Sequence, residues 1–202
     1  MTIELIARLN PKIQQYVMGR GGVSELTWEM IAGAITGLSK NHNILINILR
    51  ESAYPQEFTE IKNWLMSNVL NRMANLNDYC RKMSNYELAM GVSTITLYCY
   101  LKPKITCYEC HGLMVVLKQK NKLENCTCCK GTGLVAYTIK AKLNMAGWQK
   151  NYSEVGAIQP LMNEKSYLMK WASYEKFALS LLQQLESEIA EKIKDSLFSN
   201  HY

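Results

Sequence analysis

The sequence lacks the features that mark membrane proteins, exported proteins and several common enzyme classes. No apolar run approaches the roughly 18 to 20 residues that a membrane span needs, and Met1–Glu4 does not begin a basic leader with an apolar core. There is no Gly-x-Ser-x-Gly elbow, no Gly-x-x-x-x-Gly-Lys loop and no His-Glu-x-x-His helix, and the three histidines are widely scattered. We therefore expect a soluble, intracellular protein that makes no membrane contact, is not an enzyme and has no small-molecule substrate.

Positive charge is concentrated in one segment. The chain has 202 residues, of which 48% are apolar, enough for a packed core, and a formal net charge of +6. Residues 102–150 hold nine lysines and only two glutamates, whereas the remainder has 14 basic and 15 acidic residues. A compact basic surface favours phosphate contacts, so this segment is the candidate for nucleic-acid binding.

Apolar periodicity predicts a mainly α fold, a helical bundle with a small inserted metal-binding hairpin and a possible helix-turn-helix. We divide the chain into a mobile arm (1–25), a helical region (26–101), a basic metal module (102–150) and C-terminal helices that pack on the helical region (151–202). The expected helices cover residues 27–38, 44–50, 58–73, 88–101 and 171–197, the last being one long helix or two in line. Ser84 and Glu87 form a capping box before the fourth of them.

The possible helix-turn-helix lies after the basic segment. Ser153 predicts the cap of a short helix ending near Leu161, residues 163–165 predict a turn, and Ser166 predicts the cap of the long C-terminal helix. The second helix would present Lys165, Lys170 and Lys176 to DNA. Its aromatic residues, Trp171 first among them, are expected to lie in the core.

The cysteines give the strongest chemical signal. Cys107-x-x-Cys110 is followed by fifteen residues and then by Cys126-x-x-Cys129, a spacing typical of one structural, four-thiolate zinc site. Gly112 and the equivalent Gly131, each two residues after a pair, are placed where a turn leaving the metal needs a positive φ. Four thiolates leave no open position for catalysis, so we expect a structural zinc ion.

Alternatives to this ligand set stay open. Cys128 is a third thiol for two places, and His111 could replace a cysteine, although we interpret it as a turn or phosphate-contact residue. Cys107 to His111 also matches the pattern for covalent haem attachment, which would leave the second pair unexplained. The remaining cysteines, Cys80 and Cys99, fall in helical patterns and are expected to be small buried side chains.

Lysines on and beside the hairpin are the candidate DNA contacts in this segment. They are Lys102, Lys104, Lys118, Lys120, Lys122, Lys130, Lys140 and Lys142. A solvated loop kept soluble by its charge is the alternative.

This arrangement resembles the Q-type late-gene antiterminators of lambdoid bacteriophages. The likeness rests on Cys107-x-x-Cys110-His-Gly and Cys126-x-x-Cys129-Lys-Gly-x-Gly within a helical protein of this size, and it covers roughly residues 27–197. Flanking segments that contribute to it are residues 30–34, 63–65 and 163–171, followed by Lys176. Three departures are Met114 in place of a second glycine, the extra thiol of Cys128, and a weakly basic N-terminal arm.

The resemblance implies a zinc-containing transcription regulator in the bacterial host cytoplasm. Such a protein binds double-stranded DNA overlapping a late promoter, engages a paused bacterial RNA polymerase that carries a sigma factor, and allows read-through of pauses and terminators. Two other interpretations are a zinc-knuckle chaperone-like adaptor, which lacks here the His-Pro-Asp signature of J-domains, and a zinc-containing DNA-binding repressor.

Overall fold

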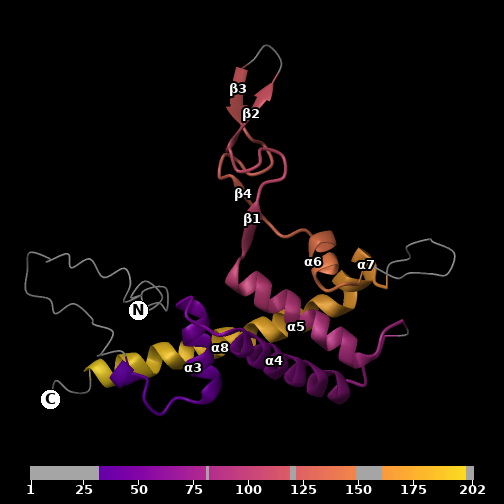
Figure 1. Ribbon diagram of the computed structural model, residues 1–202. Coiled ribbons are helices and arrows are strands. Elements are labelled where there is room, and N and C mark those ends of the chain that lie inside the picture. Colours follow the sequence, from indigo (N-terminus) through magenta and orange to yellow (C-terminus); the bar gives the residue numbers. More distant parts are fainter. Residues whose placement is uncertain (1–31, 81, 119–121, 149–160, 199–202) are drawn as a thin grey trace, which may run out of the picture. The chain divides into compact units, whose positions relative to one another are not determined.

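The computed structural model describes residues 32–80, 82–118, 122–148 and 161–198. These residues form a mainly helical protein with four short strands (Figure 1), as the sequence predicts. None of the helices in the described ranges is long and apolar enough to cross a membrane. The expected N-terminal arm, residues 1–25, lies outside these ranges.

The chain divides into two compact units. The described part of the first comprises residues 32–65 and 179–198, and the second runs from Met66 to Ala178. Two long helices, α4 (Pro55–Asn75) and α8 (Ala172–Phe198), contribute residues to both units.

The first unit is built on α3 (Lys40–Leu49) and on parts of α4 and α8. Its core is entirely aliphatic at the most buried positions, which include Leu45, Ile61, Leu182 and Ile189. His42 Nε2 lies 2.7 Å from Glu188 Oε2, and Ser39 Oγ lies 2.6 Å from His42 Nδ1. This hydrogen-bonded chain links the start of α3 to α8.

The second unit contains α5 (Asn85–Leu101), whose start is the predicted capping box. The Glu87 N–H donates to Ser84 Oγ at 3.2 Å, and the Ser84 N–H donates to Glu87 Oε2 at 2.8 Å.

Gly91, on α5, lets the Trp148 side chain approach closely, since a Cβ at Gly91 would lie 2.2 Å from Trp148 Cζ2. Trp148 follows the short helix α6 (Ile139–Met145), which begins where the Ala141 N–H donates to Thr138 Oγ1 at 3.1 Å. Its side chain is 2% exposed, so it fastens this segment to α5.

Two details of the predicted helices are wrong. The first expected helix ends at Ala34, and residues 35–37 form a turn in which Gly37 has φ +88°. Ser166 is not a cap: Asn163 Oδ1 accepts the Ser166 N–H at 2.8 Å and starts α7 (Glu164–Ser166), and a π-helical turn (Tyr167–Trp171) joins it to α8. The side-chain amide oxygen of Asn163 accepts from the third N–H of the helix. Asn163, and not the hydroxyl of Ser166, therefore caps the helix.

The non-cluster cysteines also differ from the prediction. Cys99 lies on α5 and is half-buried, and burial raises its pKa. Cys80 lies outside the helices, is also half-buried, and forms an isolated β-bridge with Met83. Helical spacing therefore predicted the wrong local structure for Cys80.

Candidate metal centre

The cysteines lie in a smaller unit than the predicted segment 102–150, namely residues 104–136, which we call the metal module from here on. It is made of two antiparallel strand pairs joined by two tight turns. Strand β1 (Lys104–Thr106) pairs with β4 (Leu134–Ala136), and β2 (Val115–Lys118) pairs with β3 (Lys122–Asn125). The first turn connects β1 to β2 and carries Cys107 and Cys110, while the second connects β3 to β4 and carries Cys126 and Cys129. In Figure 1 the β2–β3 hairpin and the β1–β4 pair extend in opposite directions from the turns.

The two turns repeat the same backbone conformation. After the first pair, φ is positive at His111 (+48°), Gly112 (+85°) and Met114 (+68°); after the second it is positive at the equivalent Lys130 (+54°), Gly131 (+77°) and Gly133 (+73°). Equivalent backbone hydrogen bonds link each turn to the other. The Cys107 N–H donates to the Gly133 carbonyl and the Cys126 N–H to the Met114 carbonyl, each at 2.8 Å. The sequence prediction of positive φ at Gly112 and Gly131 is confirmed, and the pattern extends to Met114.

Four sulfur atoms meet between these turns. The Sγ atoms of Cys107, Cys110, Cys126 and Cys129 all lie within 4.8 Å of one another, and all four residues are buried. Cys107 Sγ is 3.8 Å from Cys126 Sγ, and Cys110 Sγ is 3.7 Å from Cys129 Sγ. These separations far exceed the roughly 2.05 Å of a disulfide, and all four thiols are free. The predicted set of four cysteines is therefore brought together at a site that could hold a metal ion.

Electrostatics at the cluster also favour a cation. The Cys110 N–H, aided by that of Glu109 and opposed by burial, lowers the pKa of the Cys107 thiol to about 6. The Cys129 N–H acts in the same direction on Cys126, but burial and hydrogen bonds with the neighbouring thiols raise the pKa of Cys126 to about 12. Four adjacent thiols do not all ionise without a compensating positive charge, and a metal cation held by the four sulfur atoms would supply that charge.

Cys128 lies beside the cluster but outside the set of four. It is half-buried, packs against the four cysteines, and is hydrogen-bonded to Tyr108 and to Cys107. His111 is exposed and occupies the left-handed region, as a turn residue does.

Two residues near the sulfur atoms were not singled out from the sequence. Tyr108 and Glu109 occupy the variable positions of the first Cys-x-x-Cys pair, and the Cys126 Sγ lies 3.4 Å from Glu109 Oε2. The signal that could have found them is the turn itself, because a four-residue turn around a metal keeps its middle side chains close to the opposite thiols.

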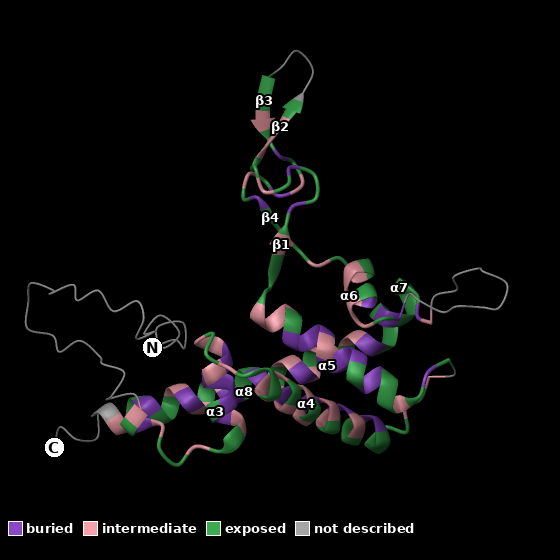
Figure 2. Cartoon of the chain, viewed as in Figure 1, coloured by how far each residue is buried: buried purple, intermediate pink, exposed green. Residues whose placement is uncertain are grey.

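Burial differs between the two turns and the β2–β3 hairpin that connects them (Figure 2). The cysteines are buried, whereas the β2–β3 hairpin exposes two facing leucines, Leu117 at 66% and Leu123 at 64%. Leu113 is 73% exposed. Among the residues of the module that the structure describes, the only apolar core is the four cysteines and the residues packed on them, which include Val116 and Val135.

The predicted DNA contacts are distributed over several elements. The exposed lysines among them are Lys102, Lys104, Lys122, Lys130, Lys140, Lys165, Lys170 and Lys176. Lys142 is half-buried and forms an ion pair with Glu175, and Lys170 Nζ lies 2.6 Å from Asp78 Oδ1, so neighbouring carboxylates offset both charges. Lys118 ends β2, and Lys120 lies outside the described residues.

The helix-turn-helix is only partly within the described chain. Its expected first helix, from Ser153 onward, falls in residues 149–160, outside the described ranges. The expected second helix is present as α7, the π-helical turn and α8. Trp171 (4% exposed) and Tyr174 (1%) lie in the core, as predicted.

No protein-family model, curated protein or solved structure matches this chain.

Proposed function

We propose that the four cysteines bind one structural zinc ion. A tetrahedral site with Zn–S bonds of about 2.3 Å has S···S edges of about 3.8 Å. The two cross-turn pairs have edges of 3.8 and 3.7 Å. Tetrahedral four-sulfur coordination suits zinc or iron, and a zinc site of this kind is closed to substrate.

The zinc-folded module is proposed to bind double-stranded DNA. The observation that carries this proposal is the pairing of Lys118 with Lys122 directly across β2 and β3. This register assigns one lysine from each strand to the same end of the hairpin, and a concentration of lysines favours contact with nucleic-acid phosphates. Lys104 and Lys130, both exposed on the same module, add to the positive surface.

The DNA-binding protein is further proposed to act as a phage late-gene transcription antiterminator. The support is the resemblance of the two cysteine turns and their flanking helices to that family, together with a mainly helical fold around a small cysteine module. In this role the module contacts promoter-region DNA, and helical surfaces contact a sigma-containing bacterial RNA polymerase. No catalytic step is assigned to the chain.

A transcription assay tests this role. A template carrying the chain's own promoter region and a downstream terminator is transcribed by sigma-containing RNA polymerase with and without the protein. We expect added read-through that disappears with the Cys107→Ser variant. Promoter occupancy without added read-through would instead identify a repressor.

A chaperone-like adaptor is the second candidate, and the exposed leucines of the module favour it. Leu113, Leu117 and Leu123 could bind unfolded protein segments in the way that exposed apolar patches do. Replacing Leu117 and Leu123 with serine separates the two functions. Loss of binding to an unfolded client with unchanged DNA affinity would support the adaptor.

A further inference from the structure

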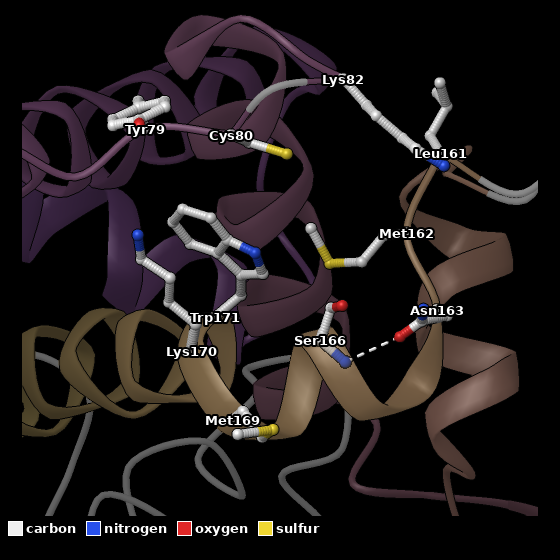
Figure 3. A pocket seen from close by; sticks show the side chains of 10 residues that line it. All are labelled: Tyr79, Cys80, Lys82, Leu161, Met162, Asn163, Ser166, Met169, Lys170 and Trp171. Atoms are coloured by element: carbon white, nitrogen blue, oxygen red, sulfur yellow. Dashed lines mark hydrogen bonds between the residues drawn. The ribbon is translucent and has the colours of Figure 1, made fainter.

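A pocket in the second unit lies outside the metal module. Its volume is about 520 Å³, within the range of ligand sites. The lining comes from three segments: the loop after α4, the residues that lead into and form α7, and the π-helical turn (Figure 3). The lining residues are Tyr79, Cys80, Lys82, Leu161, Met162, Asn163, Ser166, Met169, Lys170 and Trp171.

The π-helical turn shapes one wall of this pocket. It buries Tyr167 and Trp171 while leaving Leu168 58% and Met169 78% exposed. Trp171 stacks on Tyr174, with ring centroids 5.7 Å apart, so its indole is held in place. Single π-turns within helices occur frequently at functional sites, because they shift the faces on either side of the insertion.

The walls are apolar and rich in sulfur. Met162, which is 3% exposed, and the exposed Met169 supply thioethers, and Cys80 adds a thiol. Methionine side chains adapt their shape and recur on surfaces that bind varied peptide side chains. Tyr79 (63% exposed) and Met169 (78%) leave the apolar lining open to solvent, which fits a macromolecular ligand.

The net charge at the rim is positive and comes from the exposed Lys82, because the Asp78 carboxylate offsets the charge of Lys170. Figure 3 shows Lys82 and Lys170 on different sides of the opening, with Met162 and Trp171 between them. Lys170 is held by Asp78 at 2.6 Å and lies 4.8 Å from the Trp171 ring centroid, so it is fixed at the rim.

We propose that this pocket binds a protein segment that presents a bulky apolar side chain next to a carboxylate. The apolar side chain enters beside Met162, Met169 and Trp171, and the carboxylate meets Lys82. This binding site is separate from the proposed zinc and DNA sites, and the proposal does not depend on either of them.

The test uses the full chain and a library of random 12-residue peptides. Peptides are selected on the wild-type protein, and the affinities of those enriched are measured by fluorescence anisotropy. We expect enrichment of a large apolar residue next to Asp or Glu. Affinity should fall at least tenfold with Lys82→Glu and with Met169→Glu, both at exposed positions, and less than twofold with the matched control Lys176→Glu.

A charge exchange makes the test specific. A selected peptide whose acidic residues are replaced by lysine should bind Lys82→Glu more tightly than it binds the wild type. The proposal is overturned if enriched peptides lack acidic residues or bind Lys82→Glu as tightly as the wild type. It is also overturned if sedimentation shows that Met169→Glu dissociates a wild-type dimer, or if single-stranded DNA displaces the peptides.

Discussion

The metal module and the helices of the second unit are stabilised by different means. The helices bury large apolar side chains, such as Trp148, Leu88 and Leu143, whereas the module buries four cysteines and exposes its leucines. Burying a large apolar side chain contributes about 1.5–3 kcal/mol, so the helices carry their own stability. The described part of the module lacks such a core, so we expect its fold to depend on a bound cation. On this hypothesis, one chain contains a region folded by packing and a region folded by metal coordination.

Removing one sulfur ligand should have the largest effect and should act on the module alone. Cys107→Ser is expected to abolish stoichiometric metal binding, because structural zinc contributes on the order of 10 kcal/mol to the folding of such small modules. Metal content measured by mass spectrometry should fall from one ion per chain to none, with most of the helical circular dichroism retained. The matched control is Cys128→Ser, which should keep the metal. Full metal content in Cys107→Ser would refute the ligand assignment.

Truncating a packed side chain should have the opposite result: the helices should lose stability while the module keeps its metal. Trp148→Ala removes the contact with Gly91 and the 6.1 Å ring contact with Tyr167, and it should cost about 3–5 kcal/mol of unfolding free energy. Denaturant unfolding measures this loss, while metal content stays at one ion per chain. If the metal were lost together with the helices, the two regions would form one cooperative structure and the contrast would fail.

The left-handed residues of the two turns offer a smaller and directional test. Gly133 has φ +73°, and an added Cβ would lie 2.8 Å from the Gly112 carbonyl oxygen, so Gly133→Ala should weaken metal binding. At the equivalent Met114, φ is +68°, and a left-handed conformation disfavours an L side chain by about 1–2 kcal/mol. Met114→Gly should therefore tighten metal binding, as measured by competition with a chelator. Equal affinities for both variants would contradict the matched geometry of the turns.

The smallest expected effect is a pH-dependent change in the unfolding free energy of the helical region. Hydrogen bonds from Lys170 and then Tyr174 lower the pKa of Asp78 below its usual 3.8. Because the folded pKa is lowered, this stabilisation is present above pH 3.8 and is lost as the pH falls through the folded value. Tyr174→Phe should cost about 1 kcal/mol at pH 7 and less at lower pH, which urea unfolding across pH measures. A deficit that does not change with pH would show that Asp78 is not the partner that matters.

Local patterns predicted most of the fold and the clustering of the four cysteines. The capping box at Ser84, the long helices and the four metal-site cysteines depend on residues close in sequence, and all were found where spacing placed them. The repeated turn conformation was also predictable from the sequence, since Gly112 and Gly131 occupy equivalent positions after the two cysteine pairs.

Features that depend on competing local interactions or on distant packing were missed. Asn163 takes the cap expected of Ser166, and the π-helical turn that follows has no periodic signature. The ion pairs of Lys142 with Glu175 and Lys170 with Asp78 join residues far apart in sequence, so the lysine count alone overstated the available charge. The pocket beside Trp171 depends on three separate segments and has no sequence pattern.

The central claim is that a metal ion folds a basic module that binds DNA. The most direct measurement is a DNA-binding titration of the full chain at several salt concentrations, with the zinc-loaded protein and with the same protein after chelation. The account predicts that the logarithm of the affinity falls linearly with the logarithm of salt concentration for the zinc-loaded chain, and that chelation abolishes binding. Affinity that is indifferent to salt, or unchanged by removal of the metal, would contradict it.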